Sequence, residues 1–307
     1  MAAPDFTRIL VLRGGAIGDF ILTLPVLSTL RRRYPGARLE ILGYPRIASL
    51  AQAAGLAHQV RGVEDPALAS FFTRGSELNP GWRDYFGGFD LVISYLADPG
   101  GCFLGNLRQC TRAVILTGPP RPDEAGDLHA TQVFLRPLAE LGIERGEPIP
   151  EPLLVLPPGP PLPPGPWLAA HPGSGGARKN WPEDCWRACL EALAARTDYH
   201  LLLVGGEAEA GRVERLARAL PAGRVRLACH RPLPELGQML RHCARFVGHD
   251  SGITHLAAAV GLPCLVLWGP SRLPIWRPPG RHVRVLSAPE GLGQLAVETV
   301  LQQIITG

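Results

Sequence analysis

The sequence predicts an α/β protein made of two doubly wound domains, and three observations support this fold class. Short apolar runs rich in Ile, Val and Leu alternate with amphipathic helical patterns, which is typical of parallel sheets covered by helices on both faces. A proline-rich stretch at 157–166 interrupts this alternation near the middle of the chain and can form neither a helix nor a central strand. The length of 307 residues is sufficient for two separate cores.

The alternation predicts the elements of each domain in order. For the N-terminal domain, residues 1–156, we expect strands near 8–13, 38–43, 90–95 and 113–117, and helices near 18–33, 45–54 and 128–142. Residues 157–166 form the expected linker. For the C-terminal domain, residues 167–307, we expect strands near 167–171, 200–205, 224–228, 245–248 and 263–268, and helices near 182–196, 207–219, 234–242 and 251–260. A terminal helix is expected within 289–305, and the periodicity leaves open whether it crosses back to the first domain.

Composition narrows the function classes. The net charge is only +4 and the arginines are scattered, so we expect no nucleic-acid partner. Seven cysteines without a CxxC pair predict reduced thiols and a cytoplasmic protein. The first residues lead directly into the strand at 9–12, so we expect no signal peptide. The apolar stretch at 256–268 is too short to span a bilayer, which limits any membrane contact to a peripheral one.

One loop carries the single lysine among 31 basic residues. Lys179 lies in His171-Pro-Gly-Ser-Gly-Gly-Ala-Arg-Lys-Asn-Trp-Pro182, a glycine-rich loop that enters a helix, and such loops bind phosphate. A compact ammonium on a flexible stem differs from a planar guanidinium in how it meets a phosphate oxygen. Lys179, Ser174 and Gly175 are therefore candidate ligands of an anion. The alternatives are codon chance for the lysine and a simple surface turn for the loop.

A second loop, Arg13-Gly-Gly-Ala-Ile-Gly-Asp19, follows the first strand and opens the first helix. Gly15 and Gly18 fit two glycines of a dinucleotide fingerprint, but Arg13 takes the place of the first glycine. A dehydrogenase interpretation therefore rests on a near-match only. Asp19 lies at the carboxyl end of a strand, where chemistry is expected, but the helix dipole also favours an acid there.

A third loop, Gly248-His-Asp-Ser-Gly-Ile-Thr-His-Leu256, enters another helix. Asp250 and Ser251 lie at the helix entry, and Ser251, Gly252 and Thr254 can offer hydrogen-bond donors to a diphosphate. A hydrolase triad is disfavoured because the nucleophile elbow is absent.

Two further segments are open to either a functional or a structural interpretation. Glu207 or Glu209, in the loop after the Leu-rich strand, can accept hydrogen bonds from ribose hydroxyls or cap a helix. The run Trp268-Gly-Pro-Ser271 can shape a pocket wall or simply form a turn.

Together these loops predict a cleft enzyme that holds a nucleotide diphosphate in its second half. Transfer of a sugar from such a diphosphate needs a base for the acceptor hydroxyl, here Asp19, and positive charge for the leaving group, here Lys179 and the amides near 251–254. A single base opposite the leaving group predicts inversion through an oxocarbenium-like transition state. The sequence has no zinc-like cluster and no DxD run, so we expect no metal and no cofactor besides the donor substrate.

Three segments in order give a resemblance to a known family. They are Ile9-Leu-Val-Leu-Arg…Ile17-Gly-Asp19…Thr23-Leu-Pro25, the 171–182 loop, and Gly248-His-Asp-Ser-Gly-Ile-Thr-His-Leu-Ala-Ala258. The chain thereby resembles glycosyltransferase family 9, the ADP-heptose:lipopolysaccharide heptosyltransferases.

The resemblance implies a GT-B fold, two Rossmann-like domains facing a central cleft. It also implies an inverting, metal-independent transfer of heptose from ADP-heptose to a lipopolysaccharide inner-core acceptor. The implied roles are general base for Asp19 and donor phosphate or sugar binding for Lys179. Contacts to heptose and diphosphate are implied for Asp250, Ser251, Gly252 and His255.

The sequence departs from this family pattern at two places. Gly14-Gly15-Ala16 stands where relatives often have hydroxyl side chains, and Arg272 stands where they often have an acid. These departures leave the donor sugar and the acceptor open. The alternatives are another NDP-sugar donor, a nucleotide-sugar epimerase, and a non-catalytic nucleotide-sugar-binding protein, although a simple binder would need no base such as Asp19.

Overall fold

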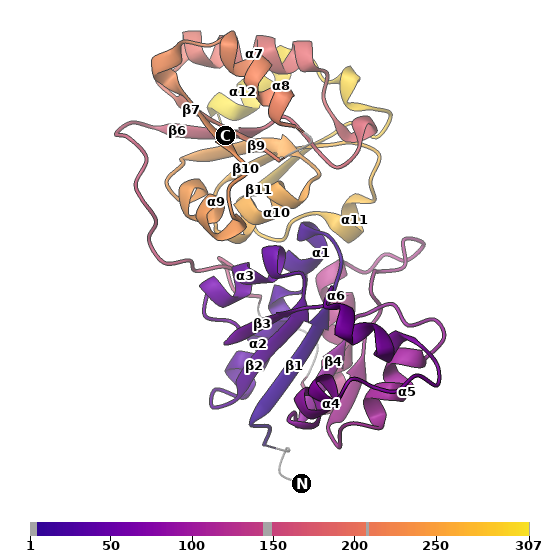
Figure 1. Ribbon diagram of the computed structural model, residues 1–307. Helices are drawn as coiled ribbons and strands as arrows, with labels where there is room; N and C mark the ends of the chain where they lie inside the picture. Colours follow the sequence, from indigo (N-terminus) through magenta and orange to yellow (C-terminus); the bar gives the residue numbers. More distant parts are fainter. Residues whose placement is uncertain (1–4, 144–148, 207–208, 307) are drawn as a thin grey trace. The chain divides into compact units, whose positions relative to one another are not determined.

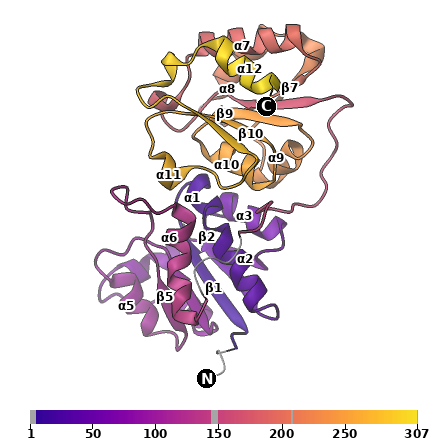
Figure 2. The same cartoon turned by 180° about the vertical axis from the view of Figure 1, so that it is seen from behind.

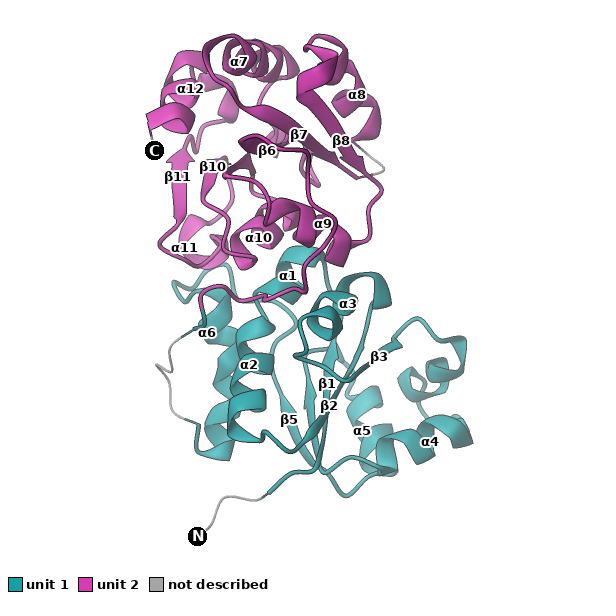
Figure 3. Ribbon diagram, turned by 90° about the vertical axis from the view of Figure 1, so that its left-hand side faces the viewer, with its two compact units in different colours: residues 1–150 teal, residues 151–307 magenta. Residues whose placement is uncertain are grey.

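The computed structural model describes residues 5–143, 149–206 and 209–306. The chain divides into two compact units, Met1–Pro150 and Glu151–Gly307 (Figure 3). Each unit contains one parallel sheet with helices on both faces (Figure 1), which confirms the predicted pair of doubly wound α/β domains. The division falls before the proline-rich stretch, and the segment leading into that stretch is already tied to the second unit, because Leu154 N donates to Ala259 O.

Unit 1 has a five-stranded sheet of order β3-β2-β1-β4-β5. Its strands are β1 (Arg8–Arg13), β2 (Arg38–Gly43), β3 (Gln59–Gly62), β4 (Leu91–Ser94) and β5 (Val114–Thr117). Its α-helices are α1 (Ile17–Ile21), α2 (Leu24–Arg33), α3 (Pro45–Ala53), α4 (Pro80–Gly87), α5 (Cys102–Arg108) and α6 (Ala130–Leu135). Two 3₁₀ helices, η1 (Pro66–Phe72) and η2 (Arg136–Leu141), complete the unit.

Unit 1 differs from its predicted elements in identifiable ways. The helix expected at 18–33 is two helices, and the second carries Pro25 in its first turn, where the missing N–H of proline is tolerated. The helix expected at 128–142 becomes a 3₁₀ helix from Arg136 onward. The edge strand β3 and the helices α4 and α5 were not predicted; β3 is only partly buried, so its apolar pattern is weak.

Two layers of helices cover the sheet of unit 1. On one face, η1, α4 and α5 enclose an aromatic core that includes Phe71, Trp82, Phe86 and Phe103. On the other face, α2 packs beside α6 (Figure 2). The first strand lies in the middle of this sheet, between β2 and β4, so its carboxyl end is held from both sides.

Unit 2 has a six-stranded sheet of order β11-β10-β9-β6-β7-β8. Its strands are β6 (Trp167–His171), β7 (His200–Gly205), β8 (Val225–Cys229), β9 (Arg245–His249), β10 (Cys264–Trp268) and β11 (Val283–Ser287). Its α-helices are α7 (Glu183–Arg196), α8 (Ala210–Arg218), α9 (Leu233–Leu240), α10 (Gly252–Ala259), α11 (Leu273–Trp276) and α12 (Val297–Thr306). Three 3₁₀ helices are η3 (Ala177–Lys179), η4 (Ala222–Arg224) and η5 (Leu292–Gln294).

The terminal helix belongs to the core of unit 2. It begins at Val297 rather than near Pro289, and α7, α8 and α12 line one face of the sheet while α9 and α10 line the other (Figures 1 and 3). Leu301 and Ile304 are buried in the same cluster as Trp186 of α7, and Arg196 forms an ion pair with Glu298 at 2.9 Å. The edge strand β11, which was not predicted, lies beside β10 and is only partly buried.

Both sheets reverse their winding direction at one point. In unit 1 the reversal lies between β1 and β4, and in unit 2 between β6 and β9. Ligands of doubly wound folds bind outside the carboxyl ends of the strands at such points. The loops after β1, β6 and β9 are therefore the positions where the fold favours a site. In the residues described above, no helix combines the length and apolar character required to cross a membrane.

Two buried histidines end the strands at the reversal point of unit 2. His171 closes β6 and His249 closes β9, with 3% and 0% of their surface exposed. Burial is the main cause that lowers the pKa of His171 to about 3 and that of His249 to about 4, because a charged imidazole loses its hydration. Both rings are therefore neutral in the folded protein at physiological pH.

We expect these two histidines to make unit 2 sensitive to mild acid. Their pKa values are lower in the folded than in the unfolded chain, so their contribution to stability is complete above pH 6.5. It is lost as the pH falls toward 4, by about 1.4 kcal/mol per pH unit for each histidine. The measurement is the free energy of unfolding from urea titrations between pH 7.5 and 5, above the range in which most carboxylates titrate.

A matched pair of variants tests whether the loss of stability in mild acid comes from the buried histidines. His249→Gln removes one of the two groups and should reduce the pH slope by about half, whereas His242→Gln, at an exposed position, should leave it unchanged. A slope in His249→Gln equal to that of the wild type would contradict the assignment.

Candidate functional site

The candidate site of unit 2 brings together the loops that follow β6 and β9. Lys179, in the first loop, places its Nζ 2.6 Å from Oδ2 of Asp250, in the second. The Asp250 side chain is 9% exposed, whereas the Lys179 side chain is 39% exposed. The carboxylate therefore holds the ammonium, and part of the Lys179 side chain remains exposed to solvent.

The glycine-rich part of the first loop is shaped by Ser174. Its Oγ lies 2.7 Å from Asn180 Oδ1 and 3.0 Å from Gly176 O, and its side chain is buried. The hydroxyl of Ser174 therefore braces the loop. Gly175 is exposed, and a side chain added there would meet nothing within 4 Å, so its backbone is open to approach.

The second loop ends at the N-terminus of α10. Ser251 caps this helix by accepting a hydrogen bond from Thr254 N at 3.2 Å, which leaves Gly252 in the first turn. Helix N-termini attract anions through their free N–H groups and the helix dipole. Thr254 and His255 are buried at 0% and 4% exposure, so these two predicted site residues lie beneath the surface of the helix.

A buried imidazole connects both loops. The Nε2 atom of His249 accepts from Trp181 N at 2.9 Å and from Trp186 Nε1 at 3.2 Å, and its Nδ1 lies 3.2 Å from Gly173 O. On the neighbouring strand, His171 Nδ1 lies 3.3 Å from Ser251 Oγ. Sequence reasoning assigned no role to either histidine. The signal was present, because both end buried strands directly before candidate loops.

The segment of Glu207 and Glu209, predicted to contact ribose or cap a helix, and the predicted pocket wall at 268–271 have different outcomes. Glu207 lies outside the described residues, whereas Glu209 accepts a hydrogen bond from Gly206 N at 3.1 Å. A methyl group on Gly173 would lie 2.1 Å from Glu209 Cγ, so Glu209 packs against the first loop and supports it. Gly269 lies beside the same loop, since a methyl group there would be 3.8 Å from Arg178 O. The turn after β10 therefore borders the site.

The candidate site of unit 1 is the loop between β1 and α1. Asp19 is the third residue of α1 and accepts a hydrogen bond from Ala16 N at 3.0 Å. Gly15 has φ +92°, and a side chain there would place its Cβ 3.0 Å from Asp19 Oδ2. Glycine is required at this position for both reasons. Asp19 is half-buried, and its carboxylate accepts a hydrogen bond from its own loop.

Arg13 supports this loop from inside the unit. It is 2% exposed, donates to Pro120 O at 2.7 Å and to Asp19 O at 3.0 Å, and stacks over Phe134 at 4.4 Å. Burial lowers the pKa of Arg13 to about 10, so the guanidinium stays charged near neutral pH. Arg13 therefore fixes the start of α1, and its head group does not face solvent as a ligand would require.

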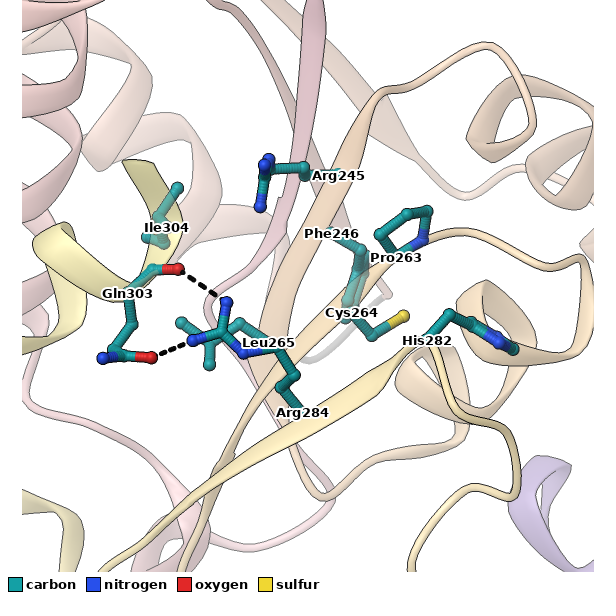
Figure 4. A pocket seen from close by; sticks show the side chains of 9 residues that line it. All are labelled: Arg245, Phe246, Pro263, Cys264, Leu265, His282, Arg284, Gln303 and Ile304. Atoms are coloured by element: carbon teal, nitrogen blue, oxygen red, sulfur yellow. Dashed lines mark hydrogen bonds between the residues drawn. The ribbon is translucent and has the colours of Figure 1, made fainter. Parts of the chain in front are cut away.

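The cavity drawn in Figure 4 lies at the other end of the unit 2 strands. It is lined by residues at the amino ends of β9, β10 and β11, among them Arg245, Cys264 and Arg284, together with Gln303 of α12. Arg284 donates to Gln303 O at 3.4 Å and also to its side-chain oxygen. Because none of the candidate residues borders this cavity, it is separate from the candidate site.

The charges and donors of the site suit a diphosphate. In unit 2 a partly exposed lysine, glycine amides and a helix N-terminus occupy the reversal point of the sheet. In unit 1 a carboxylate occupies the equivalent position. Across the described ranges, no group of three His, Cys, Asp or Glu side chains is placed to hold a metal ion.

Comparisons with known proteins agree with this arrangement. Residues 161–303 match the family model described as glycosyltransferase family 9 (heptosyltransferase). Lipopolysaccharide heptosyltransferase 3 of Escherichia coli is 25% identical over 291 residues, which cover 85% of this chain and 83% of that protein.

Two solved structures share the fold. The glycosyl transferase family 9 protein from Veillonella parvula superposes with a TM-score of 0.80 at 17% identity, covering 99% of this chain and 97% of that one. The E. coli heptosyltransferase WaaC with ADP gives 0.76 at 20% identity, covering 97% and 99%. The two Rossmann-like units thus have a GT-B fold, and the chain is a glycosyltransferase whose residues 161–303 match glycosyltransferase family 9.

Proposed function

We propose that this glycosyltransferase moves a heptose from ADP-heptose to a saccharide acceptor of the lipopolysaccharide inner core. The observation that carries the proposal is the Lys179–Asp250 pair, which presents an ammonium beside the N-terminus of α10. The names of the relatives support the choice of sugar and acceptor, and the solved relative with ADP supports the nucleotide. An acceptor of this class is anchored in lipid, so the reaction would occur at the inner face of the inner membrane.

In the proposed reaction, Asp19 accepts the proton of the acceptor hydroxyl. The acceptor oxygen forms a bond to the anomeric carbon while the bond from that carbon to the diphosphate oxygen breaks, and ADP departs. Lys179 and the backbone amides at Gly175 and at the start of α10 offset the charge of the leaving diphosphate. Displacement in one step by a single base gives inversion.

Three alternatives share parts of this site. Another NDP-sugar donor would use the same diphosphate contacts and would differ from ADP-heptose in its nucleobase or its sugar. A nucleotide-sugar epimerase would convert the donor without an acceptor. A non-catalytic binding protein would bind the donor and transfer nothing. Titration with ADP, UDP, GDP and NAD separates these donor classes, and an acceptor-dependent assay separates transfer from epimerisation.

We expect Asp19→Asn to abolish most transfer while leaving ADP binding intact. Asparagine keeps the hydrogen bond from Ala16 N but cannot accept the proton, so kcat should fall about 10²- to 10⁴-fold. The measurements are ADP release with acceptor present and the Kd for ADP by calorimetry. Asp84→Asn, at an exposed position of α4, is the matched control. Full activity in Asp19→Asn would rule out Asp19 as the base.

We expect Lys179→Ala to weaken ADP binding by about tenfold or more, because it removes a charge-assisted contact and leaves Asp250 unneutralised. Lys179→Ala combined with Asp250→Asn should recover part of this loss, since the remaining repulsion is removed. Arg178→Ala, at the exposed neighbouring position, is the control and should bind ADP like the wild type. Equal loss of ADP affinity in Lys179→Ala and Arg178→Ala would argue for a general charge effect.

EDTA should leave transfer unchanged in all of these proteins.

A further inference from the structure

His249 lies where the two donor loops meet, and its environment is more specific than that of a packed core residue. It is the last residue of β9, and its neighbour Gly248 is in register with His171 at the end of β6. Its side chain is completely buried. The next residue, Asp250, is the carboxylate that holds Lys179.

The hydrogen bonds of His249 require one protonation state. Its Nε2 atom receives two donors, Trp181 N and Trp186 Nε1, so that nitrogen must carry a lone pair. Its Nδ1 atom faces Gly173 O, an acceptor, so that nitrogen must carry the proton. The ring is therefore the neutral Nδ1–H tautomer. It meets the Trp186 ring edge to face, with centroids 5.4 Å apart.

These contacts tie both ends of the phosphate-binding loop to one ring. Gly173 directly precedes Ser174, and Trp181 follows Lys179 by two residues. The segment 174–180 contains the proposed diphosphate contacts. The residues on either side of it, Gly173 and Trp181, are both hydrogen-bonded to the His249 imidazole. The Lys179–Asp250 ion pair adds a third connection to the same strand end.

Two charged groups and one neutral titratable group act on His249, and they come from three elements. Asp250 adjoins it on its own loop, and Arg212 of α8 donates to Pro172 O at 3.0 Å. Arg212 lowers the pKa of His249, whereas Asp250 and the Gly173 carbonyl raise it. His171, on β6, is the other titratable group facing the ring and is itself neutral.

We propose that His249 is a positioning residue that presets the loop 173–181 for a nucleoside diphosphate. This inference rests on the proposed function. The neutral ring holds Gly173 and Trp181 at fixed positions, so the loop is ordered before the ligand arrives and little ordering entropy remains to be lost on binding. Because the His249 side chain is completely buried, its effect passes through the backbone of the loop.

Two conservative variants each keep the hydrogen bonds of only one ring nitrogen of His249. A glutamine amide oxygen reaches the Nε2 position and can accept from Trp181 N and Trp186 Nε1, but it releases Gly173. An asparagine amide nitrogen reaches the Nδ1 position and can donate to Gly173 O, but it releases both tryptophans. We expect His249→Gln and His249→Asn each to raise the Kd for ADP about threefold, and His249→Phe, which loses both halves, about tenfold or more.

The matched control separates positioning from general destabilisation. Leu301→Ala opens a cavity in the same core cluster, on α12, and should lower stability without changing the Kd for ADP. Hydrogen–deuterium exchange of the unliganded proteins should be faster within 173–181 in the His249 variants and unchanged there in Leu301→Ala. In turnover, KM for the donor should rise more than kcat falls.

The outcomes distinguish this inference from the proposed function. Wild-type affinity for ADP in His249→Gln and His249→Asn, with unchanged exchange of the loop, would overturn the positioning role and leave the proposed function standing. Absence of binding of ADP, UDP and GDP to the wild type would overturn both. Graded loss across the three variants, with the control unaffected, would support the role.

Discussion

The polarity of parallel strands is the constraint on which the rest of this structure depends. All carboxyl ends of a parallel sheet meet at one edge, and the reversal of winding opens a gap between neighbouring loops there. Because β6 and β9 are neighbours in register, residues 71 positions apart, Lys179 and Asp250, come within 2.6 Å. Strand order, rather than local sequence, therefore creates the candidate site in unit 2.

Placing charges at these strand ends carries a desolvation cost, and the chain offsets it differently in each unit. Asp250 is nearly buried, and the ammonium of Lys179 compensates its charge. Arg13 is also buried, but it faces two backbone carbonyls and the face of Phe134 instead of a carboxylate. The carboxylate of Asp19 accepts a hydrogen bond from Ala16 N of the same loop.

The fold and much of the site were accessible from the sequence because their signals are local. Continuous apolar runs gave the central strands, and glycine-rich loops after them gave the positions of Asp19, Lys179 and Asp250. The edge strands β3 and β11 were not predicted because they are partly exposed and lack a continuous apolar run. One helix was predicted at 18–33, although Pro25, which lies in the first turn of α2, marks the start of a second helix.

The role of His249 lay beyond sequence reasoning for a different reason. Its partners, Gly173, Trp181 and Trp186, come from a segment more than sixty residues away, so no spacing along the chain indicates them. The same applies to Glu209, whose contact with Gly173 depends on β6 and β7 being neighbours. Local motifs located the loops, and tertiary packing determined what holds them.

The division of labour between Lys179 and His249 follows from their exposure. A protonated His249 would add positive charge near a diphosphate. Its Nε2 atom, however, would then carry a proton and could no longer accept hydrogen bonds from Trp181 N and Trp186 Nε1. Each of those N–H groups would then lack a partner, at about 1–3 kcal/mol apiece, and the loop would lose its attachment at Trp181. Charge is more useful on a side chain that a ligand can reach, and Lys179 is the partly exposed one. A site that binds an anion through an ordered loop therefore keeps its buried ring neutral and its cation at the surface.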